Sequence, residues 1–200
     1  KLDEEVNNKE DVGKLGVLNG DIIAYDPKVF VSESGFIKSR FLDDKASVSV
    51  LVSLLKWLHE NKVTPATNFT FIFSTYEEVG HGAAWIPENI TELLAVDMGA
   101  IGDDLACTEF DVSICAKDSS GPYDYELTTS LIQMAKKQKL DFAVDIYPMY
   151  GSDASAALSG GANIRAALIG PGVSSSHGME RTHIKALENT FKLLVEYIQQ

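Results

Sequence analysis

Cysteine and long hydrophobic runs are the clearest absences from this sequence. Cys107 and Cys115 are its only cysteines, and they do not form a Cys-x-x-Cys pair. Two cysteines at this spacing indicate neither a disulfide framework nor a thiolate zinc site, and they fit a reducing compartment. No apolar stretch approaches the ~20 residues that a membrane-spanning helix needs, and no signal peptide opens the sequence. We therefore expect a cytoplasmic protein that has no membrane partner.

Basic side chains are also few. The 200 residues include 17 lysines and arginines against 29 aspartates and glutamates, which gives a net charge of −12 and a pI near 4.7. A surface of this charge repels the phosphates of nucleic acids and anionic lipids, so we expect neither as a partner. Composition alone indicates that most of these carboxylates are solvated. An electropositive ligand, such as a metal ion or an amine, is the alternative use for them.

Hydrophobic periodicity divides the chain into a β-rich start and an alternating remainder. Residues 15–40 contain short apolar runs separated by turn residues, with a hairpin predicted around Ser34-Gly35. The pattern changes after Arg40: a helix that follows Asp43-Asp44 and ends near Asn61 is predicted, because apolar residues from Val50 to Leu58 recur every three or four positions. The alternation that follows predicts an α/β fold, a three-layer α/β/α sandwich around a mainly parallel sheet. Its predicted strands are 69–74, 93–96, 110–116, 142–147 and 164–169, and its predicted helices are 123–138, 154–158 and 184–198.

Four acidic or histidine features lie where the predicted strands end or the helices begin. Functional groups of α/β sheets gather at the carboxyl ends of strands, so this placement attracts attention. Each feature also has an ordinary structural explanation: a helix cap, a solvated pair of glutamates, a paired buried aspartate and a loop histidine. The features are Asp43-Asp44, Glu77-Glu78, Asp97 and His177.

The combination is more specific than its parts. Carboxylates and an imidazole that follow successive strands can converge on one crevice, where oxygen and nitrogen ligands without thiolate suit zinc, manganese or cobalt. A carboxylate shared by two ions, together with a free glutamate as base, would form a hydrolytic site. The pattern therefore favours a metal-dependent hydrolase.

Four motifs carry a resemblance to a known family. They are Arg40-Phe-Leu-Asp-Asp-Lys45, Tyr76-Glu-Glu-Val-Gly80, Ala95-Val-Asp-Met-Gly99 and Gly151-Ser-Asp-Ala154. In this order they resemble successive signatures of the glutamyl and deblocking aminopeptidases, which assemble as tetrahedral particles. The resemblance extends from about Gly20 to the C-terminus.

The resemblance implies a role for each matching residue. Asp43 matches the aspartate that bridges two divalent ions, zinc or cobalt, and the peptide bond after it is commonly cis in the wider clan. Glu77 matches the general base. Glu78 and His177 match the remaining ligands of one ion, and Asp97 matches a ligand of the other.

Two further residues, Asp44 and Asp153, are expected near the substrate or behind the ligands. The family's other metal ligand is a histidine in a His-x-Asp motif upstream, and this chain has no such motif. One metal site is therefore expected to be complete and the other incomplete. We expect that the chain begins inside the family's β-barrel insertion, so that truncation explains the missing histidine.

The sequence around His177 also departs from the family. It reads His-Gly-Met-Glu-Arg-Thr-His, where His-Ser-Pro is more usual. His183 is therefore a rival ligand, although it fits better as the first turn of the last helix. His81 is a further candidate for the crevice, and His59 is expected to be structural.

These observations predict a metallo-aminopeptidase that hydrolyses N-terminal residues from peptides and is a homo-oligomer when full length. Residues 1–40 would be the remnant of the insertion domain and residues 41–200 part of the catalytic domain, inactive alone. The alternatives are a deacylase or dipeptidase on the same scaffold and a non-catalytic assembly domain. Release of an amino acid from aminoacyl anilides would distinguish an aminopeptidase from these alternatives.

Overall fold

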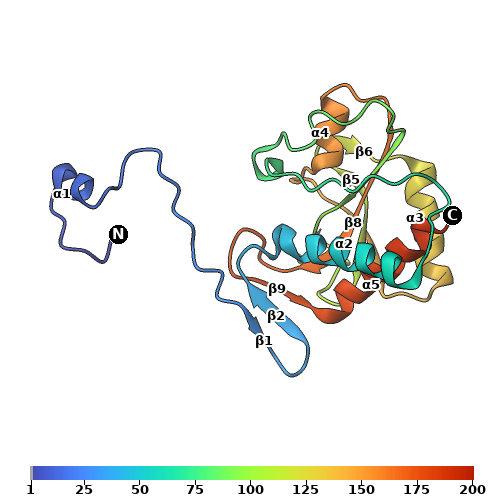
Figure 1. The fold of residues 1–200 in the computed structure, drawn as a ribbon. Coiled ribbons are helices and arrows are strands. Elements are labelled where there is room, and N and C mark those ends of the chain that lie inside the picture. The colour runs from blue at the N-terminus through green and yellow to red at the C-terminus, as the bar shows by residue number, and fades with distance from the viewer. Residues whose placement is uncertain (1) are drawn as a thin grey trace.

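A six-stranded sheet lies at the centre of the fold, and a three-stranded sheet adjoins it (Figure 1). The computed structural model describes residues 2–200. In the larger sheet β3 (Glu92–Val96) and β4 (Gly99–Ala100) pair with β8, which pairs with β5. The strands β6 (Gly121–Pro122) and β7 pair with β5. The other bounds are β5 (Val112–Asp118), β7 (Phe142–Ile146) and β8 (Arg165–Val173).

The larger sheet is mixed. The pairs β3–β8, β4–β8 and β5–β7 are parallel. The pairs β5–β8 and β5–β6 are antiparallel. The expectation of a mainly parallel sheet therefore holds for three pairs only, because hydrophobic periodicity reports which residues are buried and not the direction of a strand.

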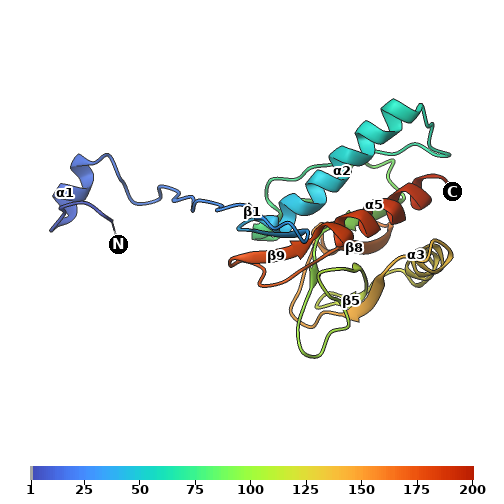
Figure 2. The same cartoon turned by 90° about the horizontal axis from the view of Figure 1, so that it is seen from below.

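Helices cover both faces of this sheet (Figures 1 and 2). On one face α2, α3 and α5 share a core with β5 and β8. On the other face Ala154 of α4 packs with residues of β3, β5 and β8. The helices are α1 (Lys9–Lys14), α2 (Leu42–Asn61), α3 (Tyr125–Lys137), α4 (Asp153–Ser159) and α5 (Ile184–Ile198). None of the described residues 2–200 belongs to a helix that is both long and apolar enough to cross a membrane.

The predicted periodicity explains the two longest helices. Leu54 in α2 and Leu194 in α5 are at most 3% exposed, and both belong to the shared core. Full burial of one such leucine stabilises the fold by about 1.5–3 kcal/mol. The start of α2, where Asp43 lies, is held by Leu42 and Ala46, which pack with Met98 and Val173.

The prediction of a strand at residues 69–74 is wrong. Phe69 and Phe71 pack against the core, but Ile72 and Phe73 are exposed. No backbone hydrogen bond joins this segment to a strand in the described part of the chain. Alternating apolar residues indicate burial on one side, whereas a strand also needs a neighbour for its N–H and C=O groups.

Residues 2–29 form an arm that extends away from the two sheets (Figures 1 and 2). The arm contains α1, and its run 16–25 contains no strand, although we expected short strands there. The predicted hairpin is confirmed: β1 (Phe30–Val31) pairs antiparallel with β2 (Phe36–Ser39). In turn, β2 pairs with β9 (Glu180–His183), a strand that periodicity did not predict.

Candidate metal centre

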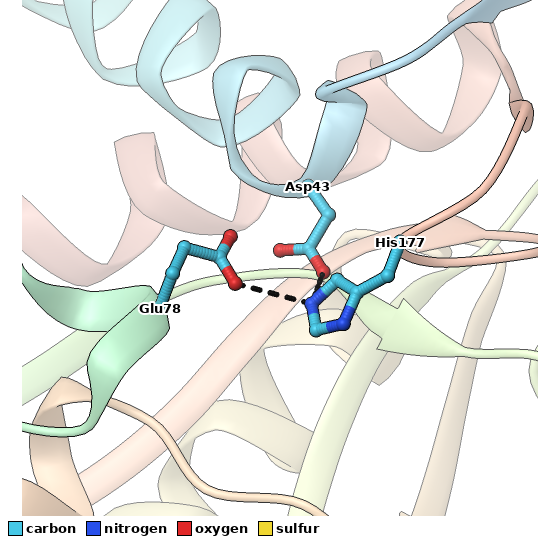
Figure 3. Close-up of side chains that lie close together, drawn as sticks. All are labelled: Asp43, Glu78 and His177. Atoms are coloured by element: carbon cyan, nitrogen blue, oxygen red, sulfur yellow. Dashed lines mark ion pairs between the residues drawn. The ribbon is translucent and has the colours of Figure 1, made fainter. Parts of the chain in front are cut away.

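Three predicted ligands from distant parts of the chain meet at one point (Figure 3). The Nε2 atom of His177 lies 3.2 Å from Oδ2 of Asp43 and 3.1 Å from Oε2 of Glu78. One ligand atom from each residue lies within 4.8 Å of the others. Two carboxylate oxygens and an imidazole nitrogen are a donor set that suits zinc or cobalt.

The start of α2 presents Asp43 to this point. The backbone of Asp43 and Asp44 is not helical, and the peptide bond between them is cis, as the resemblance implies. The hydroxyl of Ser176 donates a hydrogen bond of 2.6 Å to Oδ2 of Asp43. The Asp43 side chain is 9% exposed, whereas that of His177 is 72% exposed.

Asp43 also belongs to a second acidic cluster, with Asp44 and Asp97. Asp97 directly follows β3 and is buried, and its Oδ1 accepts a hydrogen bond of 2.6 Å from the N–H of Met98. Asp44 Oδ1 is buried and has no hydrogen-bond partner in the described part of the chain. Asp43 is therefore shared between both clusters. From the sequence we expected Asp44 near the substrate or behind the ligands, and not within a cluster of possible ligands. The adjacent pair Asp43-Asp44 is the sequence signal that could have indicated this second cluster.

The electrostatics of the two clusters require protons or cations. Burial raises the pKa of Asp44 and of Asp97 well above the ordinary range, and neighbouring carboxylates raise both further. Burial and the charge of Asp43 also raise the pKa of Glu78. Carboxylates placed together with a partnerless oxygen are stabilised by a bound cation. The residues present therefore fit divalent ions.

Glu77 lies beside the clusters but belongs to neither of them. It is the first residue of the short 3-10 helix η1 (Glu77–Val79), and it is partly buried. Burial raises its pKa to about 7, and the charges of Glu78 and Asp153 contribute. A carboxylate with a pKa near neutrality can both accept and release a proton, as a general base requires.

The remaining predicted residues lie around these clusters. Asp153, the first residue of α4, accepts a hydrogen bond of 2.6 Å from the Ser74 hydroxyl. His81 stacks on Tyr76, with ring centroids 5.0 Å apart. His183 is not in the first turn of α5: it ends β9, contacts the Ser34 carbonyl oxygen at 2.7 Å and caps α5. Neither His81, His183 nor His59, which lies in α2, joins a cluster among the described residues.

A cavity of about 810 Å³ opens over the clusters. The five predicted catalytic and metal residues line it, and small side chains of α4 line it as well. No lysine or arginine lines it within the described residues 2–200. The cavity is therefore acidic, and its volume falls in the range of small-ligand sites.

Comparisons with known proteins identify the family of this chain. The family model of the M42 glutamyl aminopeptidases matches residues 1–193. A curated protein of Bacillus subtilis (strain 168), named "Putative aminopeptidase YhfE", is 49% identical over 200 residues, which are 100% of this chain and 58% of that protein. The chain therefore belongs to the M42 glutamyl aminopeptidase family, and it spans 58% of the length of this relative.

Solved structures show the same fold. An aminopeptidase, APDkam598, from the archaeon Desulfurococcus kamchatkensis matches with a TM-score of 0.84 at 21% identity, over 98% of this chain and 57% of that one. The TET1 peptidase of Pyrococcus horikoshii matches with a TM-score of 0.74 at 23% identity, over 86% of this chain and 53% of that one. That peptidase is described as able to assemble into a tetrahedron or a large octahedral shell.

Proposed function

We propose that the protein to which this chain belongs is a metal-dependent aminopeptidase that removes N-terminal residues from peptides. The observation that carries the proposal is the convergence of Asp43, Glu78 and His177, from three separate segments, on one point of an acidic cavity. A decayed or purely structural domain has no physical reason to hold clustered carboxylates together.

Two divalent ions, zinc or cobalt, are the proposed cofactors. Asp43, Glu78 and His177 would hold one ion. Asp43 and Asp97 would hold the other, with Asp44 beside them, and a histidine outside this chain would complete that site. When bound, the ions would supply positive charge that lowers the pKa of a water molecule and polarises the scissile carbonyl group.

Glu77 is the proposed general base. Its carboxylate lines the cavity and would accept a proton from the attacking water, then deliver that proton to the leaving amine. The protonated amino terminus of a peptide is a cation, and an acidic cavity attracts it. Glu77 would therefore transfer the proton, and the carboxylates of the cavity would attract the amino terminus of the substrate.

We also propose the organisation of the whole protein. Residues 1–40 would belong to an insertion domain and residues 41–200 to a three-layer catalytic domain that is inactive without its remaining part. The arm supports assembly into a homo-oligomer, because Leu18, Ile22 and Tyr25 are at least 69% exposed. The cytoplasm is the proposed location, since both cysteines are free and buried.

Hydrolysis of aminoacyl p-nitroanilides by the full-length protein tests this function. We expect turnover that a chelator abolishes and that zinc or cobalt restores. An N-acetylated substrate is the matched control, because it lacks the free amine and should not be cleaved. Release of acetate from the acetylated substrate, without release of p-nitroaniline from the free-amine substrate, would identify a deacylase and overturn the proposal.

A further inference from the structure

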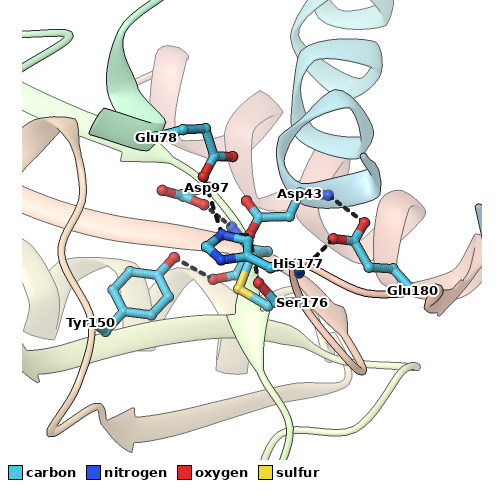
Figure 4. Close-up of polar contacts among 8 residues, drawn as sticks. Asp43, Glu78, Asp97, Tyr150, Ser176, His177 and Glu180 are labelled. Atoms are coloured by element: carbon cyan, nitrogen blue, oxygen red, sulfur yellow. Dashed lines mark hydrogen bonds and ion pairs between the residues drawn. The ribbon is translucent and has the colours of Figure 1, made fainter. Parts of the chain in front are cut away.

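Glu180, which none of the roles above uses, contacts the backbone of two proposed ligands (Figure 4). Its side chain is buried, and the residue is 1% exposed. Oε2 accepts a hydrogen bond of 2.9 Å from the N–H of Asp43, and Oε1 accepts one of 2.9 Å from the N–H of His177. No ion pair in the described residues 2–200 includes Glu180.

A buried carboxylate without a cation is costly unless hydrogen bonds satisfy it. Both oxygens of Glu180 are satisfied by backbone N–H groups, and hydrogen bonds to an ionised acceptor are stronger than those between neutral groups. The bond to His177 closes a local turn, whereas the bond to Asp43 spans 137 residues of sequence. Glu180 therefore links the backbone at Asp43 to the backbone at His177, although these two residues lie far apart in the sequence.

The backbone at His177 needs such support. His177 has a φ of +63°, in the left-handed region that non-glycine residues rarely adopt and that persists where surrounding contacts hold it. Asp43 lies in the non-helical start of α2. Glu180 itself is fixed, because it pairs with Ser39 in the ladder between β2 and β9.

We propose that Glu180 is a positioning residue, which holds the backbone of Asp43 and of His177 so that both side chains face the same metal ion. This inference rests on the proposed metal centre. The contacts of Glu180 in Figure 4 go to the backbone N–H groups of the two ligands and not to their side chains, so the residue acts through the two ligands. Residues that orient metal ligands in this way typically change metal affinity by about 10–100-fold when they are replaced.

The test is the zinc affinity of the full-length protein and its Glu180→Gln variant. Glutamine has the same size but places an NH2 group against one of the two N–H donors, so one hydrogen bond is lost. We expect zinc to bind about 10–100-fold more weakly to Glu180→Gln, with a changed visible absorption spectrum when cobalt replaces zinc. Glu188→Gln, on the exposed side of α5, is the matched control and should bind zinc like the wild type.

Circular dichroism first establishes that each variant is folded. A folded Glu180→Gln that binds zinc within twofold of the wild type, with the same cobalt spectrum, overturns the inference. If Glu180→Gln does not fold, Glu180→Asp replaces it: the shorter side chain can reach only one N–H, and unchanged affinity again overturns the inference. If neither variant folds, amide hydrogen exchange of the wild type decides, because fast exchange at Asp43 and His177 contradicts the two hydrogen bonds and slow exchange supports them. A wild type that binds no zinc refutes the proposed function itself, which is a different outcome.

Discussion

Glu77 and Glu78 are neighbours in the chain, but their carboxylates have different surroundings. Glu78 contacts His177 and belongs to the ligand cluster, whereas Glu77 belongs to neither cluster. We predict that Glu77→Gln lowers kcat by about 10²–10⁴-fold in the full-length protein, because the amide cannot accept the proton. The metal content should remain close to that of the wild type, as measured by elemental analysis.

Glu78→Gln is the matched comparison, because it makes the same chemical change one residue away. It should lose both the ion and the activity, since an amide oxygen is a weaker ligand than a carboxylate. Equal loss of metal in the two variants would show that the roles of Glu77 and Glu78 are assigned wrongly.

The raised pKa of Glu77 makes a prediction about pH. Burial and neighbouring charges raise that pKa from its ordinary value of 4.5 to about 7. The folded protein therefore keeps this proton at a pH where the unfolded chain has lost it, so the stabilising contribution is complete below pH 4.5 and is lost as the pH rises through 7. Between pH 4.5 and 7 the melting temperature of the metal-free Glu77→Gln variant should therefore fall by less than that of the metal-free wild type. Differential scanning calorimetry measures both melting temperatures. Identical pH dependence in both proteins would contradict the raised pKa.

Strand β8 pairs with three other strands, and its register with β3 ends at the pair Val96 and Ile169, next to Asp97. At Gly170 in β8 a Cβ atom would lie 1.5 Å from the backbone oxygen of Asp97, so a side chain there must displace β3 or the second acidic cluster. Gly170→Ala should therefore destabilise the chain by at least about 1–3 kcal/mol, the usual cost of overpacking.

Gly13→Ala is the control for this substitution. A Cβ atom at Gly13 in α1 would have no neighbour within 4 Å, so we expect a change of no more than about 0.5 kcal/mol. Urea unfolding followed by circular dichroism measures both variants. The close approach of β8 to β3 would be in doubt if the two substitutions had equal effects.

Periodicity predicted the elements whose burial follows from their own residues. The helices α2, α3 and α5 occur close to their expected bounds, because apolar residues at three- and four-residue spacing must face a core. Periodicity failed where the structure of a segment depends on whether a neighbouring strand pairs with it. Residues 69–74 have the composition of a strand but no neighbouring strand in the described residues, and β9 is polar yet pairs with β2.

The convergence of the candidate ligands was predictable for a related reason. Asp97 follows an apolar strand and Asp43 precedes a predicted helix, so each could be placed at an edge of the sheet from the sequence alone. The structure brings Asp43, Glu78 and His177 together as expected. The contacts of Glu180 and the second cluster at Asp44 depend on segments that meet only after folding, and no local pattern reports such meetings.

The chain has a net charge of −12, and its described residues 2–200 hold one cluster with three potential ligands and a second with only carboxylates. Three ligands with an open position can hold a catalytic-type ion, whereas carboxylates alone bind a transition metal weakly and leave it mostly hydrated. The chain of residues 1–200 should therefore hold the first ion much more tightly than the second, provided that it folds well enough to form the site.

Calorimetric titration of residues 1–200 with zinc tests this claim most directly. We predict about one tightly bound ion per chain, the number that one complete three-ligand site can hold, and loss of that binding in His177→Ala. The chain by itself should have almost no turnover of an aminoacyl anilide. No tight binding, or binding that His177→Ala leaves unchanged, would contradict the metal centre at Asp43, Glu78 and His177. Two tight sites would contradict the incomplete second site and would make His81 or Asp44 the residue to examine.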